Sequence, residues 1–200
     1  MKRNAIFLLA CFCICFSASA QKHKLNHYSI AFTTLHTNFP FGSFSNLFSK
    51  EFHPGFEIGT GFDWKTKTKH DWFQTFKFGY SYHRFVQHTL VLYSEWGYRY
   101  KFLKTFSAEA KLGGGYLQAI PVGNIYKLKE DGTYEKKNGL GRPQVMASFE
   151  LGLRKRISSS GTNIFLDYQQ RLQLPFIKSY VPLLPSNILM IGLSIPLKSK

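Results

Sequence analysis

The chain has 200 residues, of which 44% are hydrophobic, 17% aromatic and 18% charged. That length suits a single domain with a sizeable core, and so apolar a composition excludes a disordered chain. The formal net charge of +15 is typical of nucleic-acid-binding proteins, but the amino terminus predicts secretion and argues against a nucleic-acid partner.

Residues 1–20 have the three parts of a secretory signal peptide. Two basic residues, Lys2 and Arg3, precede an apolar run at 5–16, and small residues follow at 18–20. This order of basic, apolar and small residues is typical of a segment that is removed during export. The sequence therefore predicts an exported protein.

We expect cleavage after Ala20, so that residues 21–200 form one mature domain. A lipoprotein processing site at 8–11 is an alternative, although the apolar run continues past it. All three cysteines lie inside the signal segment, so the mature domain has no disulfide or thiol chemistry.

Residues beyond the signal alternate between apolar and polar side chains over eight segments. The clearest is 56–64, where aromatic and aliphatic residues alternate with residues such as Glu57, Gly59 and Asp63. A strand shows successive side chains to opposite faces, so each segment has one apolar face. In chain order the segments are 27–37, 56–64, 72–82, 90–101, 106–117, 143–154, 163–174 and 187–197.

The lengths of these segments and of their connections predict the fold. Most strands have about ten residues or more, as a membrane-spanning strand requires, whereas soluble strands cluster near five or six. The strand number is even, and the connections after strands one, five and seven are long. We therefore predict an all-β, eight-stranded antiparallel up-and-down transmembrane β-barrel in the bacterial outer membrane.

The distribution of charged residues indicates that the apolar faces point to lipid. The apolar faces carry no charged residue, whereas the opposite faces carry eleven. Arg or Lys facing lipid near mid-membrane costs about 2–4 kcal/mol, so the charged faces are expected to line the lumen. The expected luminal charge network is nearly neutral, and its members are Glu57, Asp63, Lys77, Glu95, Arg99, Glu109, Lys111, Glu150, Arg154, Asp167 and Arg171.

Most of the positive charge then falls in loops, turns and tails. It either serves solubility and protects strand edges, or contacts anionic headgroups, including lipopolysaccharide phosphates or surface polysaccharide. The longest loop, 118–142, contains five of these bases and is the best candidate for contacts with an envelope or surface partner.

Aromatic residues gather near both ends of the expected strands. Such rings form girdles at the depth of the lipid headgroups in outer-membrane barrels. The expected girdle residues are Trp64, Trp72, Tyr80, Tyr82, Tyr98, Tyr100 and Tyr116.

With these strands, girdles and signal segment, the chain resembles the small eight-stranded outer-membrane β-barrels, the OmpA/OmpX type in the broad sense. The resemblance covers residues 27–197 and is architectural, without a short diagnostic motif. Such barrels commonly end on an aromatic residue, whereas here Ile195, Pro196 and Leu197 precede a basic tail at 198–200. The resemblance implies a monomer in outer-membrane lipid.

Residue types that carry chemistry are sparse. The histidines lack metal-ligand spacing, Gly113, Gly114 and Gly115 lie inside a strand, and no cofactor site is expected. Because some small outer-membrane barrels modify lipid A, Ser81 and His83 near a strand end are kept as an alternative nucleophile and base. Their order differs from the His-x-Ser arrangement of the lipid A deacylases.

The preferred interpretation is a non-enzymatic barrel with a structural or surface-loop interaction role. Eight strands leave an interior just wide enough for side chains, so a diffusion channel is not expected. A soluble, lipocalin-like binding barrel with its apolar faces inward is the non-membrane alternative.

Overall fold

The computed structural model contains eight long antiparallel strands and one small hairpin. It describes residues 25–37, 53–123, 126–128, 132–136, 139–175 and 183–197. No helix among these residues is long and apolar enough to cross a membrane. The strands are β1 (His27–His36), β2 (Pro54–Thr66), β3 (His70–His83), β4 (Gln87–Lys101), β5 (Phe106–Pro121), β6 (Tyr126–Leu128), β7 (Tyr134–Lys136), β8 (Arg142–Arg156), β9 (Asn163–Leu174) and β10 (Leu184–Pro196).

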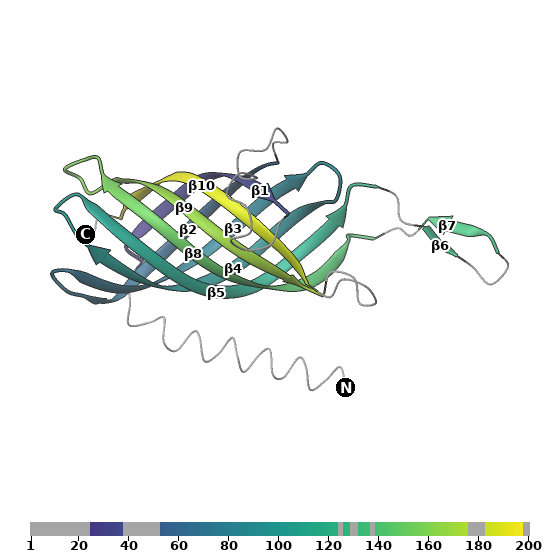
Figure 1. Cartoon of the computed structure of the whole chain (residues 1–200), viewed down its shortest axis with the longest axis horizontal. Helices are drawn as coiled ribbons and strands as arrows, with labels where there is room; N and C mark the ends of the chain where they lie inside the picture. The colour runs from purple at the N-terminus through teal and green to yellow at the C-terminus, as the bar shows by residue number, and fades with distance from the viewer. Residues whose placement is uncertain are drawn as a thin grey trace, which may run out of the picture.

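Each long strand pairs with its neighbours in the chain, and β1 pairs with β10 to close the barrel (Figure 1). Closure matters because it leaves no free strand edge. The connections 67–69, 102–105 and 157–162 share one end of the barrel, which we call the turn end. Three longer connections and the short turn 84–86 lie at the opposite end, which we call the loop end.

The outer face of the barrel is apolar. Apart from the first and last two residues of each strand, no Asp, Glu, Lys or Arg occupies an outer position of the eight long strands. In water, so large an exposed apolar surface would be exceptional. Its most exposed members include Ile30, Phe32, Leu92, Trp96, Leu112, Val145, Leu153 and Ile191.

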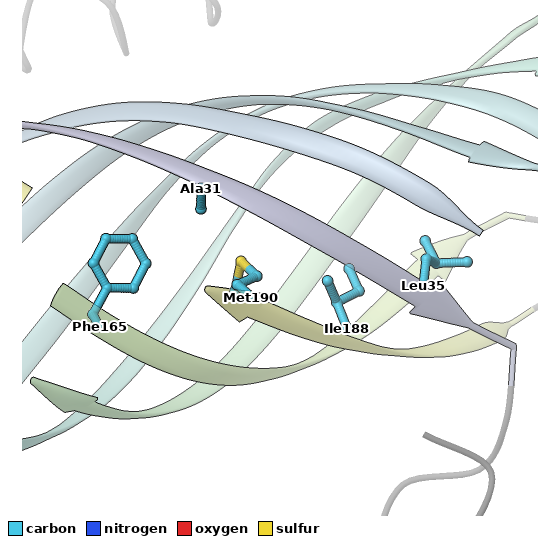
Figure 2. Close-up of a cluster of buried hydrophobic side chains, with 5 residues drawn as sticks. All are labelled: Ala31, Leu35, Phe165, Ile188 and Met190. Carbon is cyan, nitrogen blue, oxygen red and sulfur yellow. The ribbon is translucent and has the colours of Figure 1, made fainter. Parts of the chain in front are cut away.

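Charged and amide side chains fill much of the inner face, together with two apolar clusters. One cluster follows the wall formed by β1, β9 and β10, as Figure 2 shows for Ala31, Leu35, Phe165, Ile188 and Met190. The other lies on β4, β5 and β8. With charges inside and apolar residues outside, the orientation expected of a soluble lipocalin-like barrel is wrong for this chain.

Close approach of neighbouring strands explains two of the inner glycines. A Cβ on Gly97 would lie 2.3 Å from the Phe73 ring, and one on Gly113 would lie 2.2 Å from the Ser94 carbonyl oxygen. A narrow barrel needs such gaps because large inward side chains lie against the opposite or adjacent backbone. The glycine run within β5 therefore makes room for its neighbours.

Several strands extend beyond their predicted limits. The turn expected at 65–71 is confined to 67–69, and Asp71 belongs to β3. The loop expected at 175–186 ends earlier, because Leu184 begins β10. Residues 118–142, expected to be irregular, contain the end of β5 and the β6–β7 hairpin.

Phe62 is an outer residue with little exposed surface. It occupies an outer position but is only 5% exposed, because Trp64 packs edge-on against it at 5.1 Å and Phe76 lies 6.2 Å away between ring centroids. A β-bulge between Asp63 and Lys65 changes the register at this place. Phe62 therefore keeps the outer position that its parity predicts, and neighbouring outer rings cover it. The predicted signal segment 1–20 lies outside the described residues.

Candidate functional site

All eleven residues of the expected luminal charge network have inward positions on strands β2 to β5, β8 and β9. Two further residues at the turn end, Asp71 and Lys101, join them through ion pairs. The thirteen side chains comprise seven acids and six bases, so the lumen has a formal charge of −1. They form a central cluster, a turn-end cluster, and two residues that stand apart.

Lys77 lies at the middle of the central cluster. Its Nζ is 2.9 Å from Glu95 Oε2, 2.9 Å from Glu150 Oε2 and 3.4 Å from Glu57 Oε1. The three carboxylates come from β2, β4 and β8, and Lys77 is on β3. The alternation of β3 points Lys77 inward, and closure of the barrel brings the distant β8 within reach.

Lys111 on β5 is the second cation of the central cluster. Its Nζ lies 2.8 Å from Asp167 Oδ2 and 3.2 Å from Glu109 Oε2, and it donates a short hydrogen bond to Glu150. Glu150 is therefore shared by both lysines, whereas Asp167 has Lys111 as its ion-pair partner. Burial of these groups is nearly complete, so solvent does not screen the pairs.

Neutral side chains complete the central cluster and cross the lumen. Gln169 Nε2 on β9 donates to Tyr93 Oη at 3.0 Å, to Glu95 Oε1 at 3.2 Å and to Glu150 Oε2 at 2.9 Å. The Tyr93 hydroxyl donates to Glu57 Oε2. These bonds connect β2, β4, β8 and β9, so side chains fill the lumen at this level. Sequence reasoning missed Tyr93 and Gln169 because neither carries a charge.

The turn-end cluster is a second set of ion pairs, which shares Glu109 with the central cluster through Lys111. Glu109 Oε1 forms ion pairs with Arg99 Nε at 2.5 Å and with Arg154 Nε at 2.6 Å. Asp71 lies 2.8 Å from Lys101 Nζ and 3.4 Å from Arg99 Nη1. Asp71 could have been found from its parity, since it continues the inward-facing odd positions of β3.

Asp63 and Arg171 stand apart from both clusters. Asp63, for which we expected a basic partner, instead accepts a 2.6 Å hydrogen bond from Asn26 Nδ2. Arg171 donates from Nε and Nη2 to Gln169 Oε1 at 3.1 and 2.8 Å. Among the residues that the structure describes, Arg171 is the only network base without a carboxylate within 4.0 Å.

The expected girdle residues lie on the outer face in two groups. At the turn end, Trp72 packs edge-on against Tyr98 with ring centroids 5.0 Å apart, and Trp64 and Tyr100 are exposed nearby. Toward the loop end, the Tyr80 hydroxyl lies 2.7 Å from His88 Nδ1. Tyr82 and Tyr116 belong to this second group.

Ser81 and His83 lie on the inward face of β3 at the loop end, as their spacing predicts. His83 stacks on His53 with ring centroids 3.9 Å apart. Within the described residues no hydrogen bond joins Ser81 to His83. No group of three or more histidine, cysteine or acidic side chains in the described part of the chain is placed to hold a metal ion.

Comparison with known proteins identifies the fold of this chain but no relative by sequence. No protein-family model matches the chain, and a search of curated proteins finds no match. Among solved structures, Neisserial surface protein A shares 7% identity, with a TM-score of 0.53, over 86% of this chain and 96% of that one. The fold is that of the small eight-stranded outer-membrane β-barrels. The predicted fold class is thus confirmed, and the predicted outer-membrane location agrees with it.

Two other solved structures are similar over most of their length. The outer-membrane enzyme PagL shares 11% identity, with a TM-score of 0.48, over 86% of this chain and 99% of that one. The amino-terminal barrel domain of Pseudomonas aeruginosa OprF shares 11% identity, with a TM-score of 0.42, over 87% and 100%. A shared fold does not decide function, which depends on the residues described above.

Proposed function

We propose that this protein is a non-enzymatic outer-membrane barrel with a filled lumen, which acts through its surface loops. The observation that carries the proposal is the set of hydrogen bonds from Gln169 across the lumen to Tyr93 and Glu95. A lumen crossed by such bonds at its middle leaves no continuous aqueous path for a solute. Transport through the barrel is therefore not its role.

The orientation of the barrel follows from its two ends. Short turns on the periplasmic side and longer loops outside are typical of outer-membrane barrels. The turn end would then face the periplasm, and the loop end would face the cell surface. This orientation places the β6–β7 hairpin outside the cell.

The β6–β7 hairpin supports a role in surface contacts. It lies beyond the rim of the barrel (Figure 1), and its two tyrosines are 56% (Tyr126) and 72% (Tyr134) exposed. Tyrosine is enriched at protein interfaces because its ring offers apolar area and its hydroxyl a hydrogen bond. Lys136 is also exposed on this hairpin, next to the exposed Glu135. Over residues 118–142 five bases exceed three acids, so the formal charge of this stretch is +2. An acidic surface molecule, such as a phosphorylated or carboxylated polysaccharide, fits this combination.

The partner can be tested with matched pairs of lysines at the two ends. Replacing Lys127 and Lys136 by serine removes two charges from the hairpin, whereas replacing Lys67 and Lys69 removes two from a turn. We expect the hairpin variant to bind phosphorylated lipopolysaccharide in vesicles more weakly, by about 1 kcal/mol for each lysine. The turn variant should bind like wild type. Equal loss in both would refute a loop-specific contact.

Two further measurements test the barrel and the enzymatic alternative. The protein in membrane fractions should change its gel mobility on boiling, as folded barrels do, and a soluble periplasmic band would refute the location. Lipid A masses should be the same with and without the gene. A mass change that Ser81→Ala or His83→Ala abolishes would instead establish the lipid A-modifying enzyme, whose support is the shared inward face of these residues.

A further inference from the structure

Two arginines at the turn end of the lumen have donor atoms that no described protein group uses. Nη1 and Nη2 of Arg154, and Nη2 of Arg99, make no hydrogen bond to a described residue. None of the three atoms is enclosed by the protein, in contrast to Arg154 Nε. On their other side both guanidinium groups pair with Glu109, and Arg99 also pairs with Asp71. Each arginine is therefore held by a carboxylate and still presents donors to solvent.

A polar pocket lies beside these two arginines. Its volume is about 100 Å³, whereas one water molecule needs only about 10–15 Å³. Eight of its ten lining residues are polar or charged, and they come from the turn-end parts of β4, β5, β8 and β9 and from the turn 102–105. The backbone of Arg156 donates to the Thr105 carbonyl oxygen at 2.7 Å, which holds this turn against the end of β8. The pocket therefore has fixed walls and admits a group larger than water.

The charged residues that line the pocket are all basic. They are Arg99, Lys101, Lys104, Arg154 and Arg156. Lys104 and Arg156 are exposed, and neither forms an ion pair with a described carboxylate. Three acids of the network lie at this end of the lumen, namely Asp63, Asp71 and Glu109. Five bases against three acids leave an excess of two positive charges, so the pocket favours an anion.

We propose that this pocket binds a phosphate group, with Arg99 and Arg154 as fixed donors. A phosphate presents several acceptor oxygens and up to two negative charges at neutral pH, and the planar guanidinium of arginine matches its geometry. Lys104 and Arg156 add positive charge at the rim. The pocket lies inside the barrel wall, so the ligand is soluble phosphate or a soluble phosphate ester, and not a lipid headgroup. The site is independent of the β6–β7 hairpin and its partner, and only its periplasmic location rests on the orientation proposed above.

Phosphate binding can be measured directly by ³¹P NMR. The protein is purified in dodecyl maltoside, a detergent without phosphorus, and sodium phosphate replaces sodium chloride at constant ionic strength. We expect the protein to broaden the phosphate signal, and the effect to saturate. Urea unfolding in the same salts is the second readout, because a ligand of the folded state lowers the unfolding constant by the factor 1 + [L]/Kd, about tenfold at ten times Kd. A parallel unfolding series in micelles that contain phosphatidylglycerol tests the lipid headgroup as the source.

Two matched double variants separate the pocket from the general effect of phosphate on protein stability. Lys104→Gln with Arg156→Gln removes two exposed bases from the rim and breaks no ion pair among the described residues, so the barrel should still fold. Lys67→Gln with Lys69→Gln removes two exposed bases from a turn at the same end that does not line the pocket. We expect the rim variant to bind phosphate about fivefold more weakly and the turn variant to bind like wild type.

Arg154→Lys keeps a positive charge but removes the planar donor group, and it should also weaken phosphate binding. Three results would overturn the proposal. They are no broadening of the phosphate signal by wild type, equal responses of the rim and turn variants, and stabilisation by phosphatidylglycerol without stabilisation by phosphate.

Discussion

The two lysines of the central cluster should differ in their contribution to stability. Replacing Lys77 or Lys111 by methionine removes the ammonium group and keeps much of the volume. The structure ranks the variants by the number of carboxylates that each leaves without a cation. A buried charge whose partner is removed costs about 3–5 kcal/mol.

Lys111→Met leaves one carboxylate without a cation. Glu150 keeps Lys77 at 2.9 Å, and Glu109 keeps two arginines, so only Asp167 loses its ion-pair partner. We therefore expect a loss of about 3–5 kcal/mol in the free energy of unfolding. The three contacts of Lys111 do not each contribute separately, because two of its acids remain paired.

Lys77→Met leaves two carboxylates without a cation. Glu57 and Glu95 both have Lys77 as their ion-pair partner, whereas Glu150 keeps Lys111. This variant should therefore lose more stability than Lys111→Met. The second substitution Asp167→Asn should restore part of the stability that Lys111→Met loses, because it removes the uncompensated charge.

Urea unfolding in detergent or in vesicles, followed by the gel mobility of the folded form, measures these differences. Lys136→Met on the exposed hairpin is the matched control and should change the free energy by less than about 0.5 kcal/mol. The reasoning is refuted if Lys111→Met is at least as destabilising as Lys77→Met, or if Asp167→Asn gives no rescue.

Three further predictions concern packing, lipid contact and the lumen. Gly113→Ala should lower the free energy of unfolding by about 1–3 kcal/mol, because its Cβ would lie 2.2 Å from the Ser94 carbonyl oxygen. Gly123→Ala is the control: its Cβ would meet nothing within 4 Å, and the variant should be neutral in the same urea titration. Leu112→Arg, midway along the outer face of β5, should cost about 2–4 kcal/mol in vesicles, while Leu140→Arg on the loop should cost far less. In planar bilayers the purified protein should show no steady single-channel current, and a stable conductance would contradict a filled lumen.

Side-chain alternation is a local property, and it was sufficient to predict the strands and their two faces. The eleven charged residues of the network were identified from their odd or even position in each strand alone. This works because side chains alternate strictly, so the face of one residue fixes the face of all the others in that strand. The sequence predicted strand ends less well where the alternation stopped early or was absent. Asp71 was assigned to a turn for that reason, and the β6–β7 hairpin lay in a stretch without a clear period.

Pairing across the lumen was decided only by the tertiary structure. Lys77 reaches Glu150, and Gln169 reaches Tyr93, because barrel closure brings strands together that are far apart in the chain. Composition predicted a nearly neutral interior. It could not show that, among the described residues, every other network base has a carboxylate within 4.0 Å and Arg171 has none. The axial positions of the charges depend on strand register and stagger, which are properties of the closed barrel. The sequence alone therefore determined which residues face inward, and the structure decided which of them compensate one another.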